Sequence, residues 1–144
     1  MRDIPETGPT ALPVLPFVAN SELEAHFAAL AQGRLLLPRC RRCGVVIWYP
    51  RAFCPNCGHS DVEWFESAGR GTIYSFTVVH RGNGVYANAV PYVLAYVELV
   101  EGARVLTNIV GPIEQVRIGL VVEAVVEHAD DSVILRFRPT AAQL

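Results

Sequence analysis

Two Cys-x-x-Cys pairs lying close together restrict the fold of this chain more than any other feature. Cys40 and Cys43 form the first pair, Cys54 and Cys57 form the second, and the sequence has no further cysteine. A glycine follows each pair, and glycine tolerates the positive φ that lets a backbone curl around bound sulfur. Two such pairs brought together by a hairpin offer four thiolates to one tetrahedral ion, the arrangement that Zn²⁺ prefers. The pattern predicts a zinc ribbon over about residues 38–60.

The ligand set indicates what the metal would do. Four thiolates fill every position of a tetrahedral ion and leave none for water or a substrate, so the predicted site is structural. His59 lies beside the second pair, but Cys57 is the better placed ligand of the two. The alternative for the cysteines is disulfide bonding, which requires export, and the first residues do not read as a signal peptide. We therefore expect structural Zn²⁺ in a cytoplasmic protein.

Composition suggests that the protein has a partner. The 144 residues are enough for one compact domain or for a small module joined to a larger one. Hydrophobic residues make up 51% of the chain and the mean hydropathy is +0.29, which is high for a small protein and suggests surface that a partner covers. No apolar run approaches the roughly 18 residues of a membrane-spanning helix, so we expect no membrane span.

Charge is distributed unevenly along the chain. The net charge is −2 and the pI about 6.1, which argues against a dedicated nucleic-acid binder, because such proteins are usually strongly basic. The segment 33–60 contains five arginines and no Asp or Glu; five positive charges against −2 for a four-thiolate zinc centre leave about +3. These residues are Arg34, Arg39, Arg41, Arg42 and Arg51. They either offset the thiolates or bind an anion or a partner, and both interpretations stay open.

An extended arm and one helix are predicted before the ribbon. Residues 1–19 contain four prolines and are expected to form an arm that is mobile or laid along a neighbour. Ser21 and Glu24 make a capping box, and the apolar spacing that follows predicts a helix over 21–32 that Gly33 ends. Its apolar stripe covers either the body of this chain or a partner. The stripe consists of Leu23, Phe27 and Leu30.

Two kinds of β-structure are predicted after the helix. Within the ribbon, residues 45–49 are predicted to form a short strand, and Trp48, Tyr49 and Phe53 are expected to cover the metal. Beyond residue 66 the sequence is rich in β-branched and aromatic residues interrupted by short turns, which is typical of strands. The predicted strands span residues 71–80, 92–100, 104–110, 120–128 and 133–137, and a glycine-containing loop occupies 81–90. Five strands with short turns suit a small barrel, the OB-fold.

The order of these elements, together with several short motifs, resembles one protein family. We expect a mainly β chain with an N-terminal helix, a four-cysteine zinc ribbon and a five-stranded OB-fold barrel, divided into an arm (1–19), helix plus ribbon (20–66) and barrel (67–144). The matching motifs are LPRCRRCG at 37–44, PRAFCP at 50–55, GRGTIYSFTVVHR at 69–81, PYVLAYVEL at 91–99 and FRP at 137–139. Together they are similar to the zinc-ribbon OB-fold proteins associated with acyl-CoA enzymes, over about residues 20–140.

The resemblance implies a non-catalytic accessory or scaffold subunit of a thiolase-superfamily or related acyl-CoA enzyme, of thiolase, aldolase, hydratase or acyltransferase type. It implies that the helix and ribbon dock on the enzyme in a hetero-oligomer, and that the barrel helps to hold acyl-CoA or its pantetheine arm. The sequence shows no catalytic domain, so we expect the reaction to belong to another chain. The docking candidates are Leu23, Phe27, Leu30, Arg41, Arg42, Trp48 and Arg51.

A candidate ligand-binding loop follows the first barrel strand. In OB-folds the loop between strands one and two commonly contacts ligand, and arginine near apolar surface suits the phosphates and tether of CoA. An ordinary flexible hairpin is the alternative interpretation of this loop. The candidates are His80, Arg81, Gly82, Asn83 and Tyr86.

Two other functions were weighed against the accessory role. Zinc ribbons and OB-folds also bind single-stranded nucleic acid, and Tyr74 and Phe76 could stack on bases, although both suit a barrel core as well. An enzyme in its own right would need a catalytic set, but the four histidines are scattered and none stands in a recognisable constellation. His26 and His128 are expected to be surface or turn residues. The remaining histidine, His80, borders the predicted ligand loop.

Overall fold

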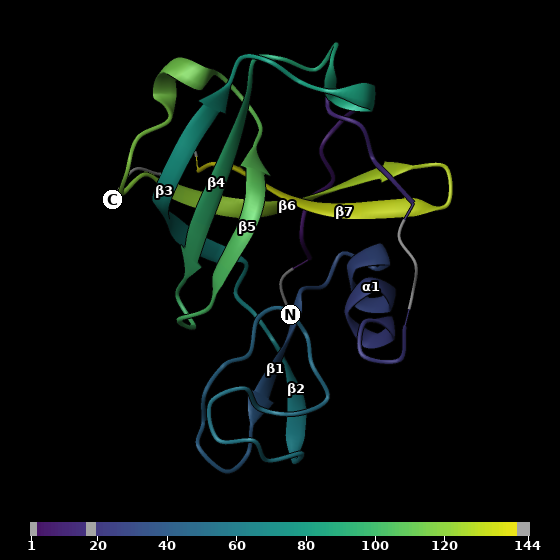
Figure 1. Cartoon of the computed structure of the whole chain (residues 1–144), viewed down its shortest axis with the longest axis vertical. Helices are drawn as coiled ribbons and strands as arrows, with labels where there is room; N and C mark the ends of the chain where they lie inside the picture. The colour runs from purple at the N-terminus through teal and green to yellow at the C-terminus, as the bar shows by residue number, and fades with distance from the viewer. Residues whose placement is uncertain (1–2, 17–19, 141–144) are drawn as a thin grey trace.

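The polypeptide forms a closed barrel with a small ribbon lobe beneath it and one helix beside the junction of the two (Figure 1). The structure is a computed structural model, and it describes residues 3–16 and 20–140. The arrangement confirms the predicted fold class: mainly β, with one N-terminal helix, a four-cysteine cluster and a five-stranded barrel. Within the described ranges, no helix has the length and apolar character needed to cross a membrane.

The ribbon lobe is built on a two-stranded antiparallel sheet. Strand β1 (Leu36–Cys40) pairs with β2 (Val62–Glu66), and the loops between them carry the Cys-x-x-Cys turns. The predicted strand at 45–49 is wrong, because only Val46 forms a bridge to β1, opposite Arg39. Pro38 explains the short pairing, since it accepts a hydrogen bond from Ile47 but has no N–H to return.

Helix α1 (Glu24–Ala31) lies within the predicted range but begins differently. The expected capping box is wrong: no side chain caps the helix from the N-cap position itself. Instead the Asn20 side-chain oxygen accepts hydrogen bonds from the backbone of Glu22 and Leu23 at 3.0 and 3.1 Å. Gly33 ends the helix as predicted, with φ +75° and its N–H donating to the Leu30 carbonyl.

Five strands close the barrel in the order β3-β4-β5-β7-β6. All neighbours are antiparallel except β5 and β7, which meet in parallel at Ile109 and Phe137. The strands are β3 (Arg70–Val79), β4 (Tyr92–Leu99), β5 (Arg104–Ile109), β6 (Val121–Ala129) and β7 (Ser132–Pro139). Each overlaps one of the five predicted barrel strands. Short 3₁₀ helices η1 (Gly84–Tyr86) and η2 (Ile113–Gln115) lie in the two longer connections.

Closure depends on β3, which pairs with both β4 and β6. A register shift between Ile73 and Ser75 bends the strand, as a bulge does at the corner of a small barrel. Gly71 lies where β4 crosses closely, and a Cβ there would overlap the backbone carbonyl of Glu98. This glycine is therefore required by the close approach of two strands.

The N-terminal arm is part of the barrel lobe rather than a mobile extension. The Ile4 backbone N–H donates to the Gly33 carbonyl, and the Ile4 side chain is buried in the main core. Pro5 and Thr7 then exchange backbone hydrogen bonds with Val126 of β6. The expectation of a mobile arm is thus wrong for residues 3–16, and residues 17–19 lie outside the described part of the chain. The arm's buried Ile4 and Leu12 side chains and the backbone N–H and carbonyl of Val126, which the arm pairs, explain the difference.

Candidate metal centre

The two Cys-x-x-Cys turns have the same backbone geometry. The Gly44 N–H donates to the Cys40 carbonyl at 2.9 Å, and the Gly58 N–H donates to the Cys54 carbonyl at 2.8 Å. Both glycines have positive φ, +76° and +77°, and nothing lies within 4 Å of the position that a Cβ would take. The requirement for glycine is therefore one of backbone conformation, not of space.

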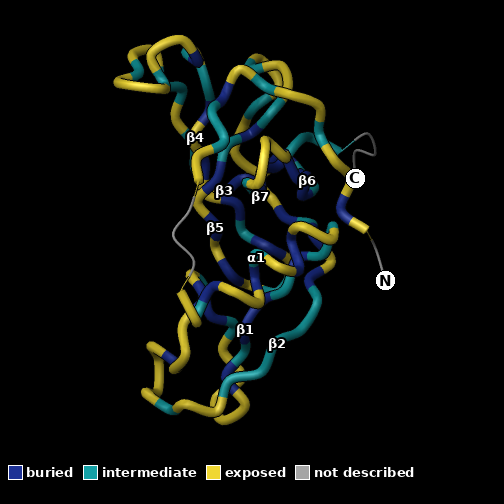
Figure 2. The backbone as a smooth tube through the Cα atoms, turned by 90° about the vertical axis from the view of Figure 1, so that its right-hand side faces the viewer, coloured by how far each residue is buried: buried dark blue, intermediate teal, exposed yellow. Residues whose placement is uncertain are grey.

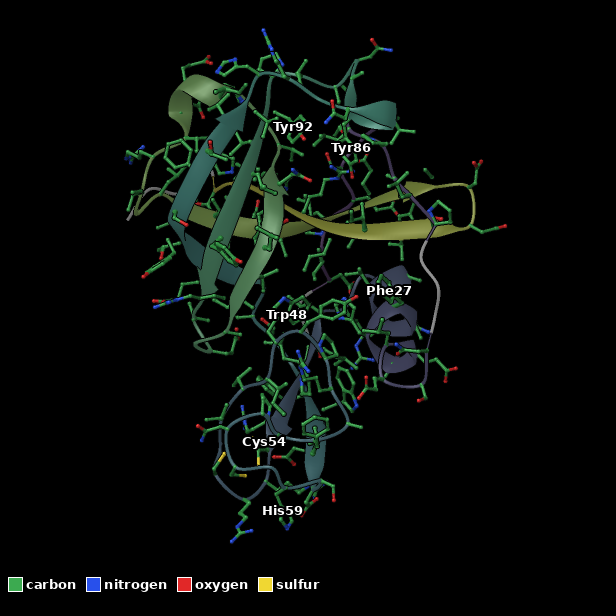
Figure 3. All side chains as sticks on the ribbon, in the orientation of Figure 1. Phe27, Trp48, Cys54, His59, Tyr86 and Tyr92 are labelled. Atoms are coloured by element: carbon green, nitrogen blue, oxygen red, sulfur yellow. The ribbon has the colours of Figure 1, made fainter. Side chains whose placement is uncertain are left out.

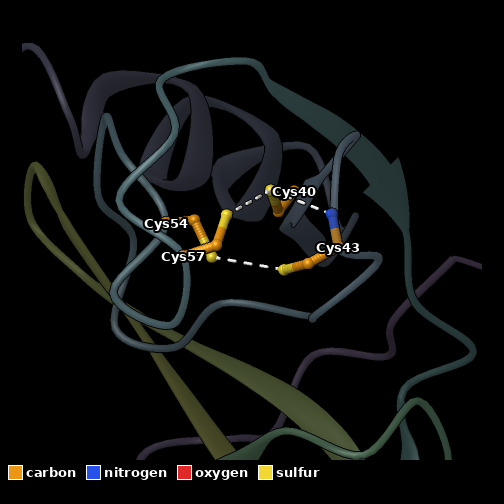
Figure 4. Close-up of side chains that lie close together, drawn as sticks. All are labelled: Cys40, Cys43, Cys54 and Cys57. Atoms are coloured by element: carbon orange, nitrogen blue, oxygen red, sulfur yellow. Dashed lines mark hydrogen bonds between the residues drawn. The ribbon is translucent and has the colours of Figure 1, made fainter.

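Four sulfurs converge at the centre of the ribbon (Figure 4). All four lie within 4.8 Å of one another, and the closest pairs, Cys40–Cys57 and Cys43–Cys54, are 3.6 Å apart. A tetrahedral ion with sulfur bonds of about 2.3 Å would hold its ligands about 3.8 Å apart, whereas a disulfide needs about 2.05 Å. The cluster is thus arranged to bind a metal ion, and the cysteines are not disulfide-bonded.

Charge on the sulfurs supports the same interpretation. Hydrogen bonds from the Val45 backbone N–H and the Asn56 side chain lower the pKa of Cys43 to about 6. The His59 backbone N–H acts in the same direction on Cys57, but burial and the other three sulfurs raise its pKa to about 11. One thiolate therefore opposes the ionisation of the next, and a cation among them removes that conflict.

Aliphatic residues, not the predicted aromatic ones, cover the buried side of the cluster. Cys40 and Cys54 are completely buried and pack with Ile47 and Val62. Cys43 and Cys57 are exposed. The expected cover of Trp48, Tyr49 and Phe53 is wrong, because Trp48 packs on the main core while the other two are 46% and 47% exposed.

The group of possible metal ligands found among the described residues consists of the four cysteines and contains no histidine. The His59 ring accepts a hydrogen bond from the Asp61 backbone through Nδ1 at 3.2 Å. His26, expected at the surface, is only 3% exposed, with its ring edge-on to Phe27 and Trp48. His128 is exposed near the end of β6 beside Glu6, so it is the surface residue that was expected but does not lie in a turn.

Acids in β2 and directly before it neutralise part of the basic ribbon. Arg41 pairs with Asp61 and Glu63 at 3.4 and 3.6 Å, and Arg34 lies 3.5 Å from Glu66. These acids follow residue 60 in the sequence but lie across the sheet from the arginines, which a count along the chain could not reveal. Arg39 stacks its guanidinium 3.9 Å from the ring of Phe65, leaving Arg42 and Arg51 on the exposed surface.

The predicted docking residues divide into buried and accessible sets. Leu30 is fully buried and Leu23 is 9% exposed, so the helix uses most of its stripe within this chain. Phe27 and Trp48 are half-buried where the helix and ribbon meet the barrel (Figure 3). Arg41, Arg42 and Arg51 are exposed on the ribbon lobe. In Figure 2 this lobe is mostly exposed chain around a buried strand.

The predicted ligand loop lies at the opposite end of the molecule from the cysteines (Figure 3). Its chain folds back on itself, because a Cβ on Gly82 would overlap the Tyr86 carbonyl. The Tyr86 ring packs against Tyr92 at a centroid distance of 5.7 Å. His80, Arg81 and Asn83 are exposed. Any contact of these residues with a ligand is therefore distant from the metal centre.

Sequence reasoning missed two features that depend on long-range contacts. One is a cleft between the helix, the ribbon and the barrel, lined by His26 and Trp48. The other is a buried ion pair between Glu127 and Arg136 on the outer face of β6 and β7. Acidic residues in one apolar strand and arginines in the next were the available signal for the pair.

Comparisons with known proteins agree with this architecture. Residues 27–63 match the family of the ChsH2 rubredoxin-like zinc ribbon domain, and residues 64–127 match the ChsH2 C-terminal OB-fold domain. The chain is similar to the solved "Ltp2-ChsH2(DUF35) aldolase", with TM-score 0.76 and 36% identity over 86% of this chain and 98% of that one.

Curated relatives differ in length. A DUF35 domain-containing scaffold protein of Methanocaldococcus jannaschii is 39% identical over 110 residues, 70% of this chain and 78% of that protein. A probable enoyl-CoA hydratase alpha subunit of Thermomonospora curvata is 38% identical over 140 residues, but this chain spans only 43% of its length. Because the shared region includes both the ribbon and most of the barrel, the chain belongs to the DUF35 family of ChsH2-type zinc-ribbon and OB-fold proteins.

Proposed function

We propose that this chain is a non-catalytic accessory subunit of an acyl-CoA-processing enzyme, and that its four cysteines hold structural Zn²⁺. The similarity to the ChsH2(DUF35) chain of an aldolase over nearly the whole of that chain carries the proposal. The names of the scaffold and hydratase relatives point the same way. The motifs of the sequence favour a thiolase-superfamily enzyme as the partner.

The ligand set supports zinc and a structural role. Cys40, Cys43, Cys54 and Cys57 would fill all four positions of the ion, which leaves no site for a substrate or an activated water. Bound there, Zn²⁺ would supply cross-linking of the two turns and no Lewis-acid step. The chain's own residues position the sulfurs through the paired glycine turns and the Asn56 side chain, which donates to Cys43 Sγ at 3.7 Å.

The ribbon loop after residue 48 is the proposed docking surface. Tyr49 and Phe53 are large aromatic residues left half-exposed, and Arg51 lies between them in the sequence. Glu22 holds this loop to the start of the helix by accepting a hydrogen bond from the Ala52 backbone at 2.8 Å. Exposed aromatic and arginine side chains on an ordered loop are typical of residues that carry interface energy. We also propose that the chain divides into an arm (1–19), helix plus ribbon (20–66) and barrel (67–144), because the helix and two-stranded sheet precede the closed barrel in the sequence.

Complex formation with a thiolase-like chain tests the proposal. The full chain is mixed with thiolase-superfamily enzymes encoded beside it, and complexes are measured by gel filtration and light scattering. We expect Tyr49→Ser with Phe53→Ser to weaken binding at least tenfold, because each removes an exposed aromatic anchor. Val85→Ser is the control, since Val85 is 62% exposed on the loop at the opposite end. Conversion of an acyl-CoA thioester by the isolated chain would refute the non-catalytic role.

A further inference from the structure

A cleft of about 320 Å³ lies where α1 and the ribbon meet the barrel. Figure 3 shows two of its aromatic residues, Phe27 and Trp48, at this junction. Its volume is at the small end of the range of about 300–1,000 Å³ that ligand pockets occupy. The wall is mainly apolar and comes from three parts of the chain: His26 and Phe27 of the helix, Trp48 and Tyr49 of the ribbon, and Leu94 and Leu106 of the barrel.

Apolar surface extends from this cleft across the outer face of β4 and β5. Leu94 and Leu106 also line a second, shallower depression with Tyr96. These three side chains are 36%, 52% and 45% exposed. Large apolar side chains on the outside of a barrel are costly to hydrate when they adjoin a cleft, so they favour a bound apolar group.

His26 places one unpartnered polar atom in this apolar wall. Its ring hydrogen-bonds to the Leu36 backbone, while Nδ1 is buried and has no hydrogen-bond partner among the described residues. Burial lowers the pKa of His26, so the ring is neutral near pH 7. Because Nδ1 is the ring nitrogen without a partner, the other nitrogen makes the bond to Leu36, and Nδ1 of the neutral ring is left as a buried acceptor without a donor, which is unfavourable.

We propose that the cleft binds a small ligand with a one- or two-ring hydrocarbon skeleton and a single O–H or N–H donor, which donates to His26 Nδ1. The apolar wall takes the skeleton, and the donor satisfies the buried acceptor of His26. Because Nδ1 is buried, a side chain beside it must move away from the cleft to admit the donor, and the half-buried Trp48 ring, edge-on to His26 at a centroid distance of 5.2 Å, is the side chain that must move. The proposal concerns the isolated chain and does not depend on its association with an enzyme.

The chemistry of the acceptor also defines what the cleft rejects. A neutral imidazole nitrogen repels the lone pairs of a carboxylate or carbonyl, so an anionic ligand would be desolvated without a partner. Two other polar side chains in the wall are already paired, since Asn108 donates to the Val93 carbonyl and accepts from Arg136, and Thr107 donates to the Leu135 carbonyl. Tyr49 is half-exposed at the ribbon side of the cleft, so His26 supplies the buried acceptor that favours a donor-bearing ligand.

Indole and 1-methylindole are matched probes, because methylation removes the N–H donor and changes little else. Binding to the full metal-loaded chain is followed by NMR titration of backbone amides and the His26 ring nitrogens. We expect indole to bind at least tenfold more tightly, with shifts at Trp48, Leu106 and His26 Nδ1. Equal affinity for the two probes, or shifts confined to other parts of the chain, would overturn the proposal.

Two variants separate the donor contact from the cleft itself. His26→Phe should bind both probes alike, because it removes the acceptor and keeps an aromatic ring. Leu106→Trp should bind neither, since the larger side chain fills the cleft from a position that is half-exposed and tolerates substitution. Thermal unfolding and circular dichroism verify that each variant is folded. Unchanged indole binding by folded Leu106→Trp would also refute the site.

Discussion

The guanidinium of Arg136 lies 2.8 Å from the carboxylate of Glu127 on the outside of the barrel, and both side chains are almost completely buried. Glu127 is on β6 and Arg136 on β7, facing away from the barrel interior. The N-terminal arm covers them, because Thr10 hydrogen-bonds to Glu127 and the Pro13 carbonyl accepts from Arg136. This ion pair therefore fixes the arm to the barrel.

Breaking the ion pair from one side should destabilise the barrel strongly. Arg136→Met leaves the Glu127 carboxylate buried without its cation, and Glu127→Gln leaves the guanidinium without its anion. We expect each to lower the free energy of unfolding by about 3–5 kcal/mol in urea titrations. Arg138→Met is the matched control, because Arg138 pairs with Glu123 at 3.0 Å in a half-exposed position and should cost less than about 1 kcal/mol. Equal losses in the two arginine variants would contradict this account.

Removal of the arm should destabilise the barrel through the same pair. Deleting residues 1–16 removes the buried side chains of Ile4 and Leu12, and with Thr10 it removes the hydrogen bonds that shield Glu127 from water. We expect a lower urea midpoint, and a smaller further loss for Arg136→Met in the truncated chain than in the intact one. A double-mutant cycle measures that coupling. Additive losses would show that the arm stabilises the barrel independently of the pair.

Local patterns in the sequence were enough to predict the cysteine turns, the helix and the five barrel strands. The paired Cys-x-x-Cys-Gly turns predict converging sulfurs because each turn is specified within five residues. The five barrel strands are readable because their β-branched runs end at turn residues such as Gly102 and Gly111, both with positive φ. Helix termination at Gly33 has the same local origin.

Features set by contacts between distant segments could not be predicted. Strands β1 and β2 were missed because their pairing depends on the turns between them, while 45–49, which has strand-like composition, pairs only at Val46. His26 was expected at the surface because the helix alone does not show that Trp48 covers it. The arm looked mobile because its partners in β6 and β7 lie more than a hundred residues later.

Metal removal should unfold the ribbon and leave the barrel folded. Cys40→Ser removes a buried ligand, and zinc binding in so small a module supplies roughly 10 kcal/mol or more of folding free energy. We expect loss of stoichiometric zinc in elemental analysis and loss of NMR dispersion for residues 36–66, while barrel resonances persist. Asn56→Ala is the milder control, because it removes only a hydrogen bond to Cys43 and should weaken zinc affinity by about 10–100-fold. A folded, zinc-free ribbon would refute the structural role of the metal.

Acidification should reveal the buried neutral histidine. Because burial lowers the pKa of His26 below its usual 6.5, the unfolded chain takes up a proton near pH 6.5 that the folded chain takes up only at lower pH. The free energy of unfolding therefore falls as pH decreases below about 6.5, by at most about 1.4 kcal/mol per pH unit from this residue. Protonation of the cysteines adds a second acid-dependent loss, so the test compares variants in the same buffers.

His26→Gln should show a shallower slope of unfolding free energy against pH between pH 7 and 5 than the unsubstituted chain. His128→Gln, altered at an exposed position, should not remove that part of the slope. Identical slopes for His26→Gln and the unsubstituted chain would mean that the ring is protonated as easily in the folded protein as in the unfolded one, and would contradict the effect of burial on its pKa.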